Sequence, residues 1–252
     1  MLVVRAEQMN CFKKAALLSF EEEMLAHLSD FAPQMIKSIG IEQTRKVVQL
    51  GVAQAAKYGF TYRGPVRFYL EMMLLFGSAF DTDPQYPWVA EILGKQDSNE
   101  QMQRAEFLYE NALDYQQKVS GSDDMYALTA LKRTASLVRH PLTIPAENYI
   151  SAMLKEIVQI YPQKAAYIGE SALEAIIRKA AAGAQRQQFL TVRGVMLVSL
   201  LMLTLGHGCG ADPLYPWVNK ILVSQDAVNP EIKIQSLEKQ FFTWLEYRLN
   251  PV

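Results

Sequence analysis

The heptapeptide Asp-Pro-Gln-Tyr-Pro-Trp-Val at positions 83–89 returns as Asp-Pro-Leu-Tyr-Pro-Trp-Val at positions 212–218, which is 129 residues later. The same spacing aligns further identical pairs, among them Pro33-Gln34 with Pro162-Gln163, Ile39-Gly40 with Ile168-Gly169, and Gly77 with Gly206. In all, 23 of 78 aligned positions are identical without a gap, which unrelated segments would rarely reach. The sequence therefore predicts a duplicated unit, and a repeat describes architecture without naming an activity.

Hydrophobic spacing predicts that each unit is built from helices. In the first unit, residues 43–58 carry apolar side chains at three- and four-residue intervals, and residues 66–76 are apolar nearly all round. Gly59 and Gly77 suit the ends of these two helices. Asp83-Pro84 looks like a capped helix start, followed by a short helix through Trp88 to Leu93. No alternating run of β-branched residues suggests a strand, so we expect an all-α fold.

Further helices are predicted outside the matched segments, at about 5–30, 99–119, 124–139 and 231–249. The polar, glycine-containing segment 120–124 is the best candidate boundary. We expect residues 1–120 to hold the first helical repeat unit and residues 121–252 the second, each with flanking helices. The repeat itself spans about 75–95 residues. The two units are expected to pack into one compact helical body.

Composition and charge narrow the functional classes. The chain has 25 basic and 26 acidic side chains, so it lacks the basic excess of a nucleic-acid binder. Its two cysteines are too few and too far apart for a disulfide framework, which indicates a reducing compartment. Charges near the amino terminus interrupt any signal-peptide core, and the apolar stretch 195–205 is too short to cross a bilayer. We expect a soluble, cytoplasmic protein that binds neither nucleic acid nor membrane.

The repeated aromatic motif is the most distinctive candidate site. Tyr86 and Trp88, with Tyr215 and Trp217 in the second unit, could form a peptide-binding groove beside the prolines. Alternatively, each tryptophan fills the core of its unit while the prolines fix the turn. Recurrence at the same place in both units favours this second interpretation.

Three other residues are candidates for contact with a partner. Met72 belongs to a methionine-rich stretch, and thioethers adapt to irregular partner surfaces, although core packing is the more common use. Asp81 and Asp83 suggest a loop of oxygen ligands, but a calcium loop needs more ligands at regular spacing. A role as solvated or capping carboxylates is the favoured explanation for both.

No catalytic constellation is recognisable. His207, Cys209 and Asp212 are of zinc-ligand type, but their spacing is weak evidence, and we expect no metal and no cofactor. Glu71 inside an apolar helix could be a general acid, yet Arg67 one turn earlier explains it as an ion pair. A nucleophile elbow and a glycine-rich phosphate loop are both missing from the sequence. These observations favour a protein that is not an enzyme.

Several phrases of the first unit resemble a known group of proteins. They are the segment 3–9 followed by Phe12, the segment 58–60, and the run from Phe68 through Phe76-Gly77 to Phe80 and Trp88. Together they are similar to uncharacterised helical proteins encoded in bacteria beside type VI secretion spike (VgrG/PAAR) and toxin genes. The resemblance covers roughly the first hundred residues, and the second unit departs from it at 208–211. It implies a cytoplasmic accessory that handles a toxin, without assigning a role to any residue.

Three functional hypotheses follow. The first is a protein-binding adaptor or chaperone for a toxic effector, whose partner is the effector or a spike component. Amphipathic client helices could lie on such a helical body. The second is an immunity protein that neutralises a cognate toxin. The third is an effector or enzyme with an unrecognised site, for which Glu71, Asp81, Asp83 and His207 are the first residues to test.

Overall fold

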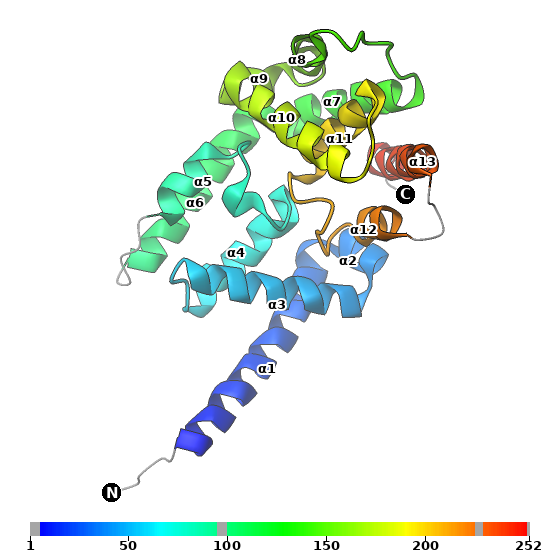
Figure 1. Cartoon of the computed structure of the whole chain (residues 1–252). Coiled ribbons are helices and arrows are strands. Elements are labelled where there is room, and N and C mark those ends of the chain that lie inside the picture. Colours follow the sequence, from blue (N-terminus) through cyan, green and yellow to red (C-terminus); the bar gives the residue numbers. More distant parts are fainter. Residues whose placement is uncertain (1–5, 95–99, 225–228, 251–252) are drawn as a thin grey trace, which may run out of the picture.

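The computed structural model describes residues 6–94, 100–224 and 229–250, and every regular element in these ranges is helical (Figure 1). The predicted all-α fold is therefore confirmed. The first helices are α1 (Ala6–Phe31), α2 (Pro33–Ile39), α3 (Ile41–Lys57), α4 (Arg63–Phe76), α5 (Pro87–Leu93) and α6 (Gln101–Tyr115). They are followed by α7 (Met125–Arg139), α8 (Tyr149–Ile160), α9 (Pro162–Ile168), α10 (Glu170–Arg186), α11 (Val192–Leu205), α12 (Pro216–Val223) and α13 (Pro230–Leu249). Within the described ranges, none of the helices combines the length and the apolar character needed to cross a membrane.

The spacing of 129 residues also relates the helix boundaries. Each of α2 to α6 begins 129 residues before one of α9 to α13, and the second half of α1 corresponds to α8. This agreement reaches α6 and α13, beyond the segment in which the sequence match is evident. Below, the counterpart of a residue is the one 129 positions away. The helix α7 follows the predicted boundary, and only its last five residues, 135–139, have described counterparts, which are residues 6–10 at the start of α1.

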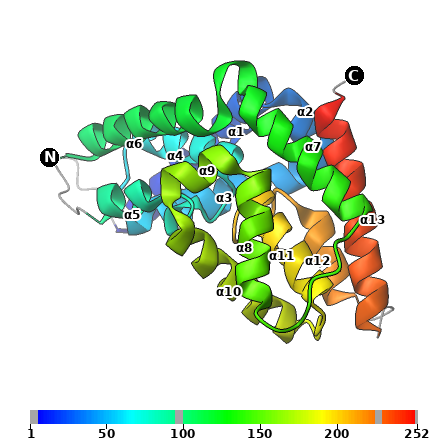
Figure 2. The same cartoon turned by 90° about the horizontal axis from the view of Figure 1, so that it is seen from above.

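The core runs through both units without a break. Its centre is formed by α4 and α11, which are the helices predicted to be apolar on most sides. Tyr69, Leu70, Met72 and Met73 of α4 are fully buried, and α11 buries most of its length from Gly194 to Leu205. Figure 2 shows α6, α4 and α1 on one side of the molecule, with α8, α11 and α13 on the other. The expected single compact body agrees with this continuous core.

Most helix ends lie where the sequence predicts them, with one exception. Gly59 and Gly77 follow α3 and α4 with positive φ angles of 72° and 92°, as expected of glycine at a helix end. The predicted helix start at Asp83-Pro84 is wrong, because α5 begins at Pro87. The carboxylate of Asp83 is occupied instead by the backbone of a turn and by the second unit, as described below.

The first half of α1 extends away from the body (Figure 1). Its side chains described between residues 7 and 19 are all exposed, including Phe12 with an exposed fraction of 65%. The spacing of Met9, Phe12, Ala16, Leu17 and Phe20 predicts one apolar face, but of these residues only Phe20 is buried. The periodicity thus predicted the helix correctly. It did not predict that the first half of the helix extends beyond the other helices, which leaves its apolar side chains exposed.

Candidate functional site

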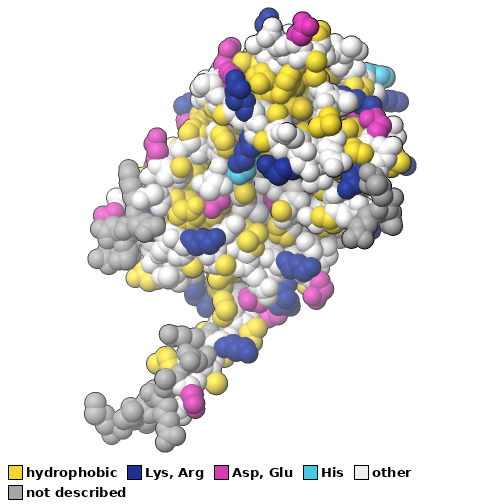
Figure 3. All heavy atoms as spheres, viewed as in Figure 1, with side chains coloured by type: hydrophobic (Ala, Val, Ile, Leu, Met, Phe, Trp, Pro, Cys, Tyr) yellow, Lys and Arg dark blue, Asp and Glu magenta, His cyan; other side chains and the backbone are white. Residues whose placement is uncertain are grey.

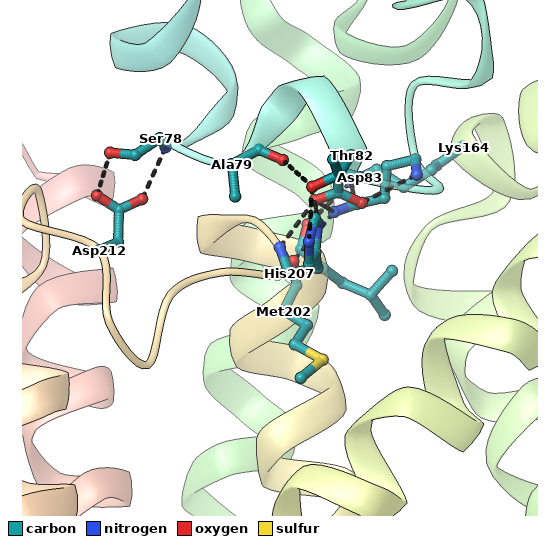
Figure 4. Close-up of polar contacts among 10 residues, drawn as sticks. Ser78, Ala79, Thr82, Asp83, Lys164, Met202, His207 and Asp212 are labelled. Carbon is teal, nitrogen blue, oxygen red and sulfur yellow. Dashed lines mark hydrogen bonds and ion pairs between the residues drawn. The ribbon is translucent and has the colours of Figure 1, made fainter. Parts of the chain in front are cut away.

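Two aspartates of the repeated motif join the units by a reciprocal exchange (Figure 4). Asp83 of the first unit accepts a hydrogen bond from the backbone N–H of His207 in the second, with an N–O distance of 2.7 Å. Its counterpart Asp212 accepts one from the backbone N–H of Ser78, the counterpart of His207, at 2.8 Å. Each aspartate also accepts the backbone N–H two residues later in its own turn. Each aspartate of the motif therefore binds a backbone N–H group in its own turn and a second backbone N–H group in the other unit.

The two aspartates differ in their second partner. Nδ1 of His207 lies 3.2 Å from Oδ2 of Asp83, whereas the hydroxyl of Ser78 donates to Asp212 at 2.5 Å. Burial acts to raise the pKa of Asp83, but the contacts with His207 and the backbone outweigh it, and the pKa is lowered. For Asp212 the effect of burial prevails over its hydrogen bonds, and the pKa is raised. We call this junction of residues 77–85 with residues 206–214 the seam. The surroundings of Asp83 in the seam thus favour its ionised carboxylate.

A buried lysine adds a second polar layer to the seam. Lys164 of α9 donates to Oε1 of Gln85 at 2.5 Å and to the carbonyl of Leu203 at 2.8 Å. The amide nitrogen of Gln85 donates in turn to Asp83 and to the carbonyl of Met202. Burial lowers the pKa of Lys164 to about 8, partly offset by the attraction of Asp83. The side chains of this layer hold the end of α11 against the first unit.

The same seam places a threonine, a histidine and an aspartate in a row. Oγ1 of Thr82 lies 3.3 Å from Nε2 of His207, whose Nδ1 faces Asp83. This order matches a nucleophile, a base and an orienting acid. However, the contact between Nδ1 and Asp83 is not aligned as a hydrogen bond, and Asp83 is already bound by the backbone of His207. We therefore assign these residues to the junction between the units.

Most of the residues proposed from the sequence as partner-binding lie inside the protein. Tyr86, Trp88, Tyr215 and Met72 are buried, and Trp217 is half-buried against the core. This placement agrees with the core interpretation that the recurrence of the motif favoured. Asp83 lies in the seam, and the partly exposed Asp81 accepts a hydrogen bond from the hydroxyl of Tyr58 at 2.9 Å.

The residues considered for metal binding or acid catalysis have other partners. Cys209 is buried, and burial raises the pKa of its thiol to about 12, so the thiolate that zinc requires is disfavoured. Asp212 binds Ser78. Oε1 of Glu71 lies 2.7 Å from Nε2 of His27 and 3.5 Å from Nε of Arg67. The ion pair inferred from the sequence is therefore present and extends to α1.

The clearest difference between the units is an open surface on α4. Phe68, Glu71 and Leu75 follow one face of this helix, and Leu75 has an exposed fraction of 59%. The counterparts on α11 are Leu197 and Leu200, with exposed fractions of 3% and 1%, and Thr204, which corresponds to Leu75 and is partly buried. This face of the central helix is therefore more deeply covered in the second unit than in the first, where Phe68 and Glu71 are partly buried and Leu75 is exposed.

Neighbouring helices extend this surface. On α6, Met102, Tyr109 and Leu113 are exposed at helical spacing, and the ring of Tyr109 packs edge-on against Phe68 at a centroid distance of 6.0 Å. On α1, the exposed Phe31 lies beside His27, which binds Glu71 of α4. We call the surface formed by Phe31, Phe68, Leu75, Met102, Tyr109 and Leu113 the α4 face. It was missed in the sequence because which side of an apolar helix is covered depends on the neighbouring helices.

In the second unit, α7 and the segment after it provide the cover. The helix α7 contacts α8, α11 and α13. Arg133 of α7 donates to the carbonyl of Gln159, and the guanidinium of Arg139 lies over the ring of Phe242. Leu137, Leu142 and other side chains of this segment line a small, partly open cavity of about 20 Å³ against α11. The packing is therefore close, since this cavity is about the size of one water molecule.

A second hollow lies between α8, α10 and the start of α11. It has a volume of about 530 Å³ and is lined by Tyr149, Ile150, Phe189, Leu190 and other residues. Figure 3 shows hydrophobic side chains gathered on the upper part of the molecule, to which these helices belong. The hollow is wide open, and the charged group that lines it, Arg178, is paired with Glu174.

Comparison of the chain with protein-family models, with curated proteins and with solved structures finds no match.

Proposed function

We propose that this protein is a protein-binding accessory of a bacterial toxin-delivery system, acting in the cytoplasm as an adaptor or chaperone for a toxic effector. The observation that carries the protein-binding part is the α4 face. Exposed apolar groups from α1, α4 and α6 meet there, although the corresponding surface of the second unit is packed under α7. Exposed apolar side chains gathered on neighbouring helices are a feature of protein interaction sites. The toxin context rests on the resemblance of the first unit.

The polar groups beside the α4 face also suit contact with a protein. Arg63 pairs with Glu23, and Arg67 with Glu71, so the charges within the surface largely balance. An interface with an apolar centre and a polar, paired rim is typical of protein–protein recognition. This balance also fits the near-neutral chain, which offers no strong field to steer a highly charged partner.

Co-purification tests this function. The tagged full-length chain is recovered from the cell that produces it, and bound proteins are identified by mass spectrometry. The proposal expects an effector or spike component, and expects Leu113→Glu to abolish its recovery. As a matched control, Leu190→Glu changes an exposed leucine outside the α4 face, so it should leave recovery intact. Recovery of neither an effector nor a spike component from wild type would contradict the proposal.

A toxicity assay distinguishes an adaptor from an immunity protein. Cells that make the recovered effector are supplied with this protein, and survival is scored. An adaptor that holds a non-catalytic region leaves the effector toxic. Rescue of growth would instead identify an immunity protein and overturn the adaptor role.

A further inference from the structure

The second unit itself shows what kind of segment fits the α4 face. The helix α7 lies on α8, α11 and α13. The counterparts of these helices are the second half of α1 together with α4 and α6, which are the helices that form the α4 face. In the first unit no described segment occupies the place that α7 takes in the second. The unfilled position therefore has the dimensions of a helix.

The residues of α7 that enter this position define a pattern. Ala130, Thr134, Ala135 and Val138 are buried, at spacings typical of one side of a helix. Three of them are small, so α7 can approach its neighbours closely. Leu137 and Leu142 line the same cavity as Met196 and Leu200 of α11. An occupant with this arrangement is an amphipathic helix of about four turns.

The first unit alters this pattern at one point. Met196 and Leu200 have Arg67 and Glu71 as counterparts. Glu71 is shared between His27 and Arg67, and the side chain of Arg67 retains an exposed fraction of 55%. An occupant that covers Arg67 must replace its water contacts, because a charged group buried without adequate partners is strongly disfavoured. An acidic side chain on the occupant satisfies this requirement.

We propose that the α4 face binds an amphipathic helix of the client in the way that α8, α11 and α13 bind α7, with an acidic side chain of that helix placed on Arg67. This inference rests on the proposed function and specifies its partner segment. In helix-in-groove binding of this kind, the groove recognises apolar side chains spaced three and four residues apart on the bound helix. The acidic residue then selects among helices that share the apolar pattern.

The probe is a fluorescein-labelled peptide of residues 125–145 that carries Leu137→Glu. Leu137 is chosen because it lines the same cavity as Met196, the counterpart of Arg67. The peptide is titrated against the intact chain and followed by fluorescence anisotropy. The α7 of the intact chain stays bound on α8, α11 and α13 and excludes the peptide from that site, because a tethered helix has a large advantage in effective concentration over a free one. Binding in excess of that site therefore reports on the α4 face.

The expected result is saturable binding that Leu113→Glu and Arg67→Glu each weaken at least tenfold. Changing position 137 of the peptide to Lys should restore binding to the Arg67→Glu chain and weaken binding to wild type. Leu190→Glu serves as the control and should leave the affinity unchanged. Both altered groups of the α4 face are well exposed, so circular dichroism and the urea midpoint should show intact folding.

Three results would overturn the inference. They are no saturable binding to wild type, binding that Leu113→Glu fails to weaken, and a light-scattering mass of a dimer that Leu113→Glu dissociates. The last would assign the α4 face to a second copy of the chain. Failure of the proposed function is a separate result, in which the peptide binds as expected but no effector or spike component co-purifies.

Discussion

Gly77 and Gly206 face each other across the seam between the units. A Cβ atom built on Gly77 would lie 2.7 Å from the carbonyl oxygen of Leu205 and 3.5 Å from the Cα of Gly206. A Cβ built on Gly206 would lie 2.9 Å from the carbonyl oxygen of Phe76 and 3.5 Å from the Cα of Gly77. The ends of the two central helices therefore meet backbone to backbone, which brings the reciprocal aspartates within reach of their partners.

Replacing Gly77 with alanine should destabilise the protein strongly. The φ angle of 92° disfavours any side chain, and the new methyl group would also press on a backbone oxygen. We expect the free energy of unfolding to fall by about 3 kcal/mol or more, measured by urea denaturation. Gly40→Ala is the matched control, because its φ is 81° but nothing lies within 4 Å of the added atom. An equal loss for both variants would show that contact across the seam is unimportant.

The two reciprocal aspartates should differ in their response to neutralisation. Asp83 is held in its ionised form by His207, so Asp83→Asn should lower the free energy of unfolding by about 2–3 kcal/mol at pH 7. The pKa of Asp212 is raised, so Asp212→Asn should lower the free energy of unfolding by only about 1 kcal/mol. Urea denaturation of the two variants provides the comparison. A larger loss for Asp212→Asn would contradict the assignment of the charge to Asp83.

The helices were predictable from sequence because local spacing decides them. Residues 43–58 and 66–76 were expected to be helical, and α3 and α4 occupy Ile41–Lys57 and Arg63–Phe76. The predicted boundary at 120–124 coincides with a turn in which Gly121, Asp123 and Asp124 have positive φ angles. Glycine and short polar residues tolerate this conformation, so composition alone marks such turns.

The seam and the α4 face depend on contacts between residues far apart in the chain. The local sequence pattern does not reveal such contacts, so neither feature could be predicted. Asp83 reads as a helix cap, but its second acceptor position is filled by His207 from 124 residues away. Lys164 follows Pro162 in what reads as the polar start of a helix, although it is buried. Leu75 belongs to a helix that reads as buried all round, and it is exposed because α7 covers only the other unit.

Lys164 should give the stability a dependence on pH. Its folded pKa of about 8 lies below the value of 10.5 for the unfolded chain, so the unfolded state binds more protons between these pH values. The free energy of unfolding should therefore rise with pH, by about 2 kcal/mol between pH 7.5 and 9.5.

Urea denaturation across this pH interval measures the effect. Lys164→Met supplies the control, since methionine is the counterpart residue at position 35 and does not titrate. The rise should be absent in this variant. A rise of equal size in wild type and variant would show that another group causes it.

The extended half of α1 should contribute little to the stability of the body. Phe12→Ser and Leu17→Ser change exposed residues, so each should shift the free energy of unfolding by less than about 0.5 kcal/mol. By contrast, Met24→Ala removes a side chain with an exposed fraction of 1% and should cost about 2–5 kcal/mol. Chemical denaturation of the monomer distinguishes the two classes. A large loss for Phe12→Ser would mean that the first half of α1 packs against something.

The reciprocal exchange of aspartates also sets an order of events during synthesis. The backbone of Ser78 obtains its cap from Asp212, which the ribosome adds 134 residues later, and the lysine that binds Gln85 arrives 79 residues after it. The amino-terminal half of a nascent chain is therefore complete in sequence long before it is complete in hydrogen bonds. Contacts this distant in sequence slow folding, and exposed intermediates of such chains are prone to aggregate. The first unit of such a chain therefore acquires these capping contacts only after the second unit has been synthesised as far as Asp212.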